Sequence, residues 1–138
     1  MGTPNTGLAA EYHVLSIPHR LGYDATLTVG NRKAVDIVVE RPTGQVSTID
    51  VKGAAGTTGW FVDNLSLKRP NHFIVFVSFG GRIQQTDTMP EVFIVPSGKV
   101  SRLTTQHPSG KKVAHPPTPR TRGAEYRDAW KQIVRGAR

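Results

Sequence analysis

Residues 34–52 read AVDIVVERPTGQVSTIDVK, and this stretch decides the fold of the chain. Two runs rich in β-branched residues, 34–40 and 46–52, flank the turn sequence RPTGQ, which is typical of two antiparallel strands joined by a hairpin loop. A third short β-rich run, 25–29, precedes them across a second turn sequence, GNRK. The sequence therefore predicts a three-stranded meander.

The charged residues of the hairpin fall on predictable faces, because side chains alternate between the two faces of a strand. Asp36 lies on the face opposite Ile37. Asp50 and Lys52 share one face, and Val51 between them lies on the other. Two acids and one ammonium group are thus expected on neighbouring strands.

A helix is predicted before the meander. Residues 6–21 carry apolar side chains that recur every three or four residues, and Gly22 follows as a stop signal. Glu11 lies on the flank of this apolar stripe, about 100° around the helix from its neighbour, so it can point along the edge of the sheet. The stripe consists of Ala10, Val14, Ile17 and Leu21.

Two further strands and a last helix complete the predicted domain. The run HFIVFVSF at 72–79 is almost continuously apolar, which is typical of a central strand buried on both faces, and EVFIVPS at 91–97 predicts another strand. Between about 99 and 123, polar residues, prolines and glycines favour an extended loop, and 124–135 predicts a helix that docks on the core. The fold class is α/β, a central mixed β-sheet of about five strands with an N-terminal and a C-terminal helix packed on it.

Length and composition narrow the classes of protein. A chain of 138 residues has room for one domain, which we expect to span residues 1–138. It contains no cysteine, which excludes a disulfide framework, a thiol nucleophile and thiolate zinc sites. It has no run of eighteen apolar residues and no signal-like N-terminus, so we expect a cytoplasmic protein that does not enter a membrane.

The formal net charge of +8 is concentrated at one end of the chain. Residues 1–98 hold eight Lys/Arg and eight Asp/Glu, whereas residues 99–138 hold the other ten Lys/Arg against Glu125 and Asp128. Such a field attracts a polyanion, so a nucleic acid is the predicted partner, although a solubilising tail has the same composition. The cations expected to bind it are Lys111, Lys112, Arg120 and Arg122.

The order of these residues resembles a known family. Glu11 on the first helix, Asp36 on a strand and Asp50-Val51-Lys52 on its hairpin partner look like the PD-(D/E)XK nuclease superfamily, which includes restriction endonucleases and archaeal Holliday-junction resolvases. The resemblance covers about residues 7–98 and the YRDAW helix near the end, and it implies a restriction-endonuclease-like core. Six segments also resemble the sequences of a group of small bacterial PD-(D/E)XK-like proteins: GLAAEY, GYDATLTVGN, VDIVVE, IDVKG, VFVSF and IVPS.

The resemblance implies a metal-dependent endonuclease that hydrolyses phosphodiester bonds of DNA. It implies Mg²⁺, for which Mn²⁺ can substitute, held by the carboxylates of Asp36, Asp50 and Glu11 with the Val51 carbonyl as a further ligand. By the same resemblance, Lys52 positions the attacking water or stabilises negative charge on the phosphate. Enzymes of this family that cut both strands are often homodimers, so a second copy of the chain is a further implied partner.

Two positions depart from the commonest pattern of the family. Asp50 stands where Glu is commoner, and Val35 stands where Pro gives the motif its name; both are tolerated variants, and neither removes a ligand. Each residue also has an ordinary structural interpretation. Asp36 can be a solvent-facing strand residue, Asp50 and Lys52 an ion pair on an exposed sheet face, and Glu11 a surface acid of the helix.

Further residues, and functions other than that of a nuclease, also fit parts of the sequence. Trp60 could stack on a base, but an aromatic residue after a Gly-rich loop more often fills a core, and we favour that interpretation. The five histidines show no ligand spacing, and among them His72 stands out because it begins a strand. Two alternatives to a nuclease are a non-catalytic nucleic-acid-binding or assembly module on the same fold, and a protein-interaction domain with an incidental basic tail.

Overall fold

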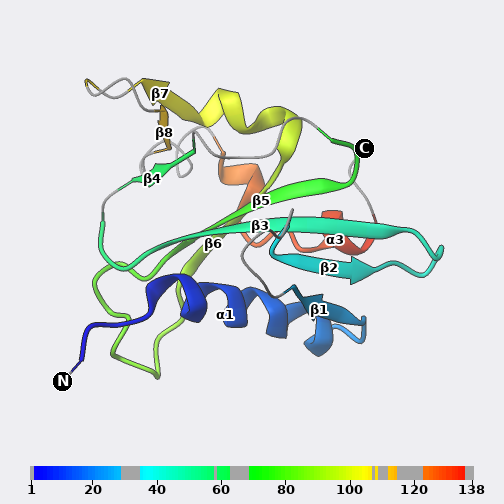
Figure 1. Cartoon of the computed structure of the whole chain (residues 1–138), viewed down its shortest axis with the longest axis horizontal. Helices are drawn as coiled ribbons and strands as arrows, with labels where there is room; N and C mark the ends of the chain where they lie inside the picture. The colour runs from blue at the N-terminus through cyan, green and yellow to red at the C-terminus, as the bar shows by residue number, and fades with distance from the viewer. Residues whose placement is uncertain are drawn as a thin grey trace.

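A five-stranded mixed sheet lies at the centre of the protein, as Figure 1 shows. The computed structural model describes residues 2–28, 35–57, 59–62, 69–106, 108, 112–114 and 123–135. The helices and strands in chain order are α1 (Thr6–Arg20), β1 (Ala25–Leu27), β2 (Ile37–Glu40), β3 (Val46–Ala54), β4 (Trp60–Phe61), β5 (His72–Ser78), β6 (Glu91–Pro96), η1 (Ser97–Leu103), β7 (Thr104–Gln106), β8 (Lys112–Ala114), η2 (Ala124–Tyr126) and α3 (Lys131–Arg135).

The central sheet has the strand order β1-β2-β3-β5-β6. The first three strands form an antiparallel meander, β3 and β5 run parallel, and β5 and β6 are antiparallel again. Parallel neighbours need a crossover connection, and the chain between β3 and β5 makes it while contributing β4 to a second sheet of order β4-β8-β7. The predicted α/β class, the mixed sheet of about five strands and the two terminal helices are confirmed.

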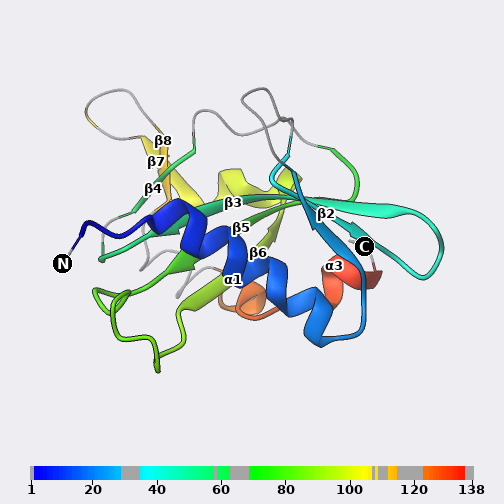
Figure 2. The same cartoon turned by 60° about the horizontal axis from the view of Figure 1, so that its bottom comes forward.

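The two faces of the central sheet are covered by different elements, which Figure 2 shows in a second view. On one face, α1 and α3 pack over the first core cluster, which contains Ala10, Val14, Ile49 and Ile133. On the other face, η1, η2 and the small sheet cover the second core cluster. The seven residues of β5 are all buried, because this strand lies between both layers. The second cluster consists of Ala54, Trp60, Val62, Ile74, Phe76, Phe93, Val95, Val100, Leu103, Ala114 and Tyr126.

Trp60 is part of this second core cluster. Its side chain is 3 % exposed, its ring lies 5.1 Å from that of Phe76, and its indole N–H donates a hydrogen bond to the Val77 carbonyl at 3.2 Å. The interpretation of Trp60 as a core residue is therefore confirmed.

The basic segment differs from the extended loop predicted for residues 99–123. Within its described residues, it contains most of η1 together with β7 and β8. Leu103 and Ala114 are buried in the second core cluster. Among the described side chains, η1 sends Val100 and Leu103 into this core, β8 sends Ala114, and β7 sends none. So few apolar residues produce no recognisable period, and for this reason the sequence did not reveal these elements.

The helix predicted at 124–135 is also interrupted. It divides into η2 and α3, because the residues between them pair with the edge of the central sheet. Arg127 forms a β-bridge with Phe93, and the Asp128 N–H donates to the Val92 carbonyl at 3.0 Å. Asp128 has a φ of 50°, which a continuous helix does not allow.

The C-terminal helix is tied to the β2–β3 hairpin by side chains that bond its last carbonyls. The buried Ser47 hydroxyl donates to the Ile133 carbonyl at 2.5 Å, and Arg41 donates from Nη1 to the Arg135 carbonyl at 3.5 Å. The last carbonyls of a helix have no partner within it, so these bonds stabilise the docked end.

Within the described ranges, no helix is long and apolar enough to cross a membrane.

Close contact between α1 and β3 depends on Gly53. A β-carbon at this position would lie 2.8 Å from the Ala10 β-carbon and 3.3 Å from the Thr6 carbonyl oxygen. Contacts of that length cannot persist, so the helix can cross the strand at this height only over a glycine. Glu11, the next residue after Ala10, is thereby held beside the end of β3.

We predict that Gly53→Ala destabilises the protein by about 1–3 kcal/mol, because the added methyl group forces α1 away from the sheet. The measurement is urea unfolding followed by circular dichroism. Gly7→Ala is the matched control, because nothing lies within 4 Å of a β-carbon there and alanine favours the helix. Equal stability of the Gly53→Ala protein and the wild type would contradict the tight packing described here.

Candidate functional site

The face of β3 that points away from α1 carries the acid and the lysine of the DVK sequence. Ile49 lies in the first core cluster and Val51 packs against it, so both point toward α1. Asp50 and Lys52 alternate with them and are half-buried on the opposite face. Thr48 precedes them on that face, and the three polar residues form a row along the strand.

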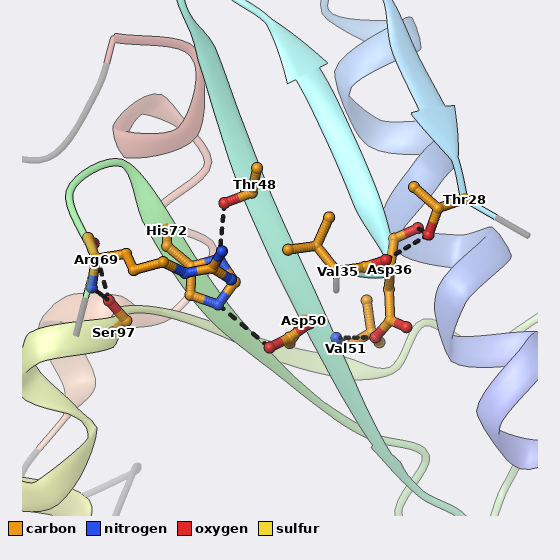
Figure 3. Close-up of polar contacts among 9 residues, drawn as sticks. All are labelled: Thr28, Val35, Asp36, Thr48, Asp50, Val51, Arg69, His72 and Ser97. Atoms are coloured by element: carbon orange, nitrogen blue, oxygen red, sulfur yellow. Dashed lines mark hydrogen bonds and ion pairs between the residues drawn. The ribbon is translucent and has the colours of Figure 1, made fainter. Parts of the chain in front are cut away.

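Asp36 lies beside this row, just before β2 begins. Its backbone N–H donates to the Ile49 carbonyl at 2.9 Å, which continues the pairing of β2 with β3. Its carboxylate Oδ2 accepts a hydrogen bond from the Val51 N–H at 2.8 Å. Thr28 holds the same segment from β1's side, because its hydroxyl donates to the Val35 carbonyl and its N–H to the Asp36 carbonyl. Figure 3 shows the Val51 and Thr28 contacts of this segment on the β2 side of β3.

The Val51 carbonyl points to the same edge as the Asp36 carboxylate. The N–H and C=O groups of one strand residue point in the same direction. Since the Val51 N–H reaches the Asp36 carboxylate, the Val51 carbonyl also points toward the β2 side of β3. A carboxylate oxygen and a backbone carbonyl are thus brought together at this edge.

Asp50 is engaged on the other side of β3, by a histidine of β5. His72 Nε2 lies 3.2 Å from Asp50 Oδ2, and His72 Nδ1 lies 2.7 Å from the Thr48 hydroxyl oxygen. The His72 side chain is 0 % exposed and the Asp50 side chain 15 % exposed. The parallel register explains the contact, because Thr48 is the partner of His72 across the two strands. Figure 3 shows this chain of three side chains beside the Arg69–Ser97 contact.

Lys52 and Glu11 complete the predicted set. Lys52 follows Asp50 by two residues, about 7 Å along the strand, and stands opposite Phe76 of β5. Glu11 is half-buried on α1 and makes a polar interaction of its own. Because α1 packs on the opposite face of β3 from Asp50, Glu11 can approach the acids only around the end of the strand, where Gly53 allows the close crossing.

The structure thus places Asp36, Asp50 and Lys52 around one stretch of β3, with the two carboxylates directed to different partners. Among the described residues, no group of three or more His, Asp or Glu side chains is arranged to hold a metal ion. The assignment of Asp36, Asp50, Val51 and Glu11 as metal ligands stays a prediction. Lys111, Arg120 and Arg122 lie outside the described residues, and so does the side chain of Lys112.

Sequence reasoning noticed His72 at the start of a strand but not its contact with Asp50. That contact depends on the register of two strands that are not adjacent in sequence, with Thr48 opposite His72. A polar residue in an otherwise apolar central strand was the available signal, because a buried polar side chain needs a partner.

Comparison with known proteins identifies the fold. No protein-family model matches the chain, and no curated protein matches it significantly in sequence. A solved structure matches the chain in fold. The bacterial homing endonuclease I-Ssp6803I superimposes with a TM-score of 0.59 and 17 % sequence identity, over 98 % of this chain and 94 % of that chain. The chain therefore has the fold of a nuclease.

We predict that Asp36→Ala lowers the free energy of unfolding by about 1–3 kcal/mol, because the Val51 N–H loses its partner at the edge of the sheet. Asp36→Asn keeps an acceptor oxygen and should cost clearly less. Urea titrations of the wild type and both variants provide the comparison. If alanine and asparagine destabilise the protein equally, the hydrogen bond to Val51 does not contribute as described.

Proposed function

We propose that the protein is a metal-dependent endonuclease that hydrolyses phosphodiester bonds of DNA, with a site of the PD-(D/E)XK type. The observation that carries the proposal is the hydrogen bond from the Val51 N–H to the Asp36 carboxylate, because it holds Asp36 against the middle residue of Asp50-Val51-Lys52. The fold supports the proposal independently, since the structural neighbour I-Ssp6803I is described as a homing endonuclease.

The donor atoms suit a hard divalent cation. Asp36, Asp50 and the Val51 carbonyl offer oxygen atoms, which Mg²⁺ and Mn²⁺ prefer over nitrogen or sulfur. Glu11 can add a fourth oxygen donor from α1. When bound, the ion would stabilise the negative charge that develops on the phosphate during hydrolysis.

The protein's own residues would position the substrate around that ion. Lys52 shares the face of Asp50, and it forms no ion pair with any described residue. Its ammonium group is therefore available to hold a phosphate oxygen or to orient the attacking water. Asp36 and Asp50 would hold the cation, and their strand positions would place it beside the face that carries Lys52.

The basic end of the chain would grip the DNA backbone. Lysine and arginine side chains neutralise phosphates and release counterions, which makes binding depend strongly on salt. The residues proposed for this contact are Lys111, Lys112, Arg120 and Arg122. A homodimer would carry two such sites and could cut both strands.

We predict that the protein cleaves supercoiled plasmid in Mg²⁺ or Mn²⁺, and that Asp36→Asn, Asp50→Asn and Lys52→Ala each reduce the rate at least about a hundredfold. The rate is measured by conversion of supercoiled to nicked and linear DNA on agarose gels, with flap and four-way substrates assayed in parallel. Asp87→Asn is the matched control, because Asp87 is an exposed acid of a connecting loop outside the site.

Cleavage that persists unchanged in Asp50→Asn and Lys52→Ala would contradict the proposed site. Absence of cleavage with every substrate and both metals would contradict the proposal that the protein is an enzyme.

A second candidate function is a nucleic-acid-binding module without catalysis. The observation that favours it is that both acids already have partners within the protein, Asp36 with Val51 and Asp50 with His72. This alternative predicts salt-sensitive DNA binding that is the same in Mg²⁺ and in EDTA.

A further inference from the structure

We propose that His72 is a positioning residue for Asp50, and that Thr48 determines which ring nitrogen of the His72 imidazole carries the hydrogen. The inference rests on the proposed function, because it assigns Asp50 to the metal. His72 itself would touch neither the metal nor the DNA. It would set the direction in which Asp50 presents its second carboxylate oxygen.

The geometry is a line of three side chains across two strands. Thr48 and Asp50 come from β3 and lie on one face, two residues apart. His72 comes from β5, opposite Thr48, and its ring spans the gap, with Nδ1 at 2.7 Å from the Thr48 hydroxyl and Nε2 at 3.2 Å from Asp50 Oδ2. Both ring nitrogens are therefore engaged by β3.

The chemistry of the partners determines where the proton lies. An ionised carboxylate only accepts hydrogen bonds, so Nε2 must carry the hydrogen that it donates to Asp50. In a neutral imidazole the other nitrogen is then an acceptor, and the Thr48 hydroxyl is the donor to Nδ1. Thr48 thus favours the tautomer that can hold Asp50.

The ring has little freedom to move. The His72 side chain is 0 % exposed, and the residue begins β5 directly beside the paired position of β3. The preceding residue, Asn71, accepts a hydrogen bond from the Thr48 N–H at 2.9 Å, so backbone and side chain both connect these strands. A buried imidazole costs stability unless its nitrogens are bonded, and here both are.

The consequence for Asp50 is a fixed carboxylate. Oδ2 is held by His72, and within the described residues no hydrogen bond reaches Oδ1. The Asp50 side chain is 15 % exposed, so its carboxylate is accessible where the histidine is not. Partners of this kind behind a metal ligand typically change metal affinity 10- to 100-fold when they are removed.

The test measures metal binding without catalysis. Isothermal titration calorimetry of the DNA-free protein with Mn²⁺ gives the Mn²⁺ affinity of the wild type. ¹⁵N NMR spectra of the imidazole report which ring nitrogen of His72 carries the hydrogen. We expect the Nε2–H tautomer, a loss of about 10- to 100-fold in Mn²⁺ affinity in His72→Leu, and recovery of most of that affinity in His72→Gln. Gln keeps an N–H donor for Asp50, whereas Leu fills the space without one.

Thr48→Val serves as a second variant, because it leaves both Asp50 and His72 in place. We expect Thr48→Val to weaken Mn²⁺ binding and Thr48→Ser, which keeps the hydroxyl, to bind Mn²⁺ about as tightly as the wild type. This pair keeps the test available if His72→Leu does not fold. An Nδ1–H tautomer in the wild type, or equal Mn²⁺ affinity in His72→Leu, His72→Gln and the wild type, overturns the role of His72 alone. A wild type that binds no Mn²⁺, or that binds it as tightly as the Asp50→Asn variant does, overturns the proposed function and this inference together.

Discussion

Strand β3 pairs with β2 on one side and with β5 on the other, and the candidate site depends on this double pairing. Peptide groups of consecutive strand residues point alternately to the two neighbours. Val51 therefore turns its backbone toward β2, where it meets the Asp36 carboxylate, and Thr48 turns its N–H toward β5, where it meets the Asn71 carbonyl. Asp50 lies between these two connections, with Asp36 on one side and His72 on the other.

The core on both faces of the sheet keeps β3 in place. Ile49 is buried beneath α1 on one face, and Ala54 is buried under the small sheet on the other. The close crossing of α1 at Gly53 sets the height of the helix along the strand. A shift of β3 by one residue would turn Asp50 toward α1 and bury its charge, so packing and site enforce the same register.

Much of this arrangement follows from the sequence because it depends on local alternation. The period of two in residues 34–40 and 46–52 is enough to predict the hairpin and the shared face of Asp50 and Lys52. The partner of Asp50 could not be predicted in this way, since the contact with His72 requires the parallel register between two strands, and the two residues lie 22 positions apart in sequence. Likewise, β7 and β8 escaped prediction because Ala114 alone marks where the latter enters the core. The metal ligands themselves stay predictions, since a shared fold does not establish a shared chemistry.

The most direct test of the site is diffraction from crystals soaked in Mn²⁺, with data collected at a wavelength where manganese scatters anomalously. The proposal predicts one strong anomalous peak at the β2 side of β3, within about 2.3 Å of oxygen atoms of Asp36 and Asp50. The Val51 carbonyl should face the same peak. Manganese bound elsewhere on the protein, with the Asp36 and Asp50 carboxylates still directed to Val51 and His72, would contradict the account.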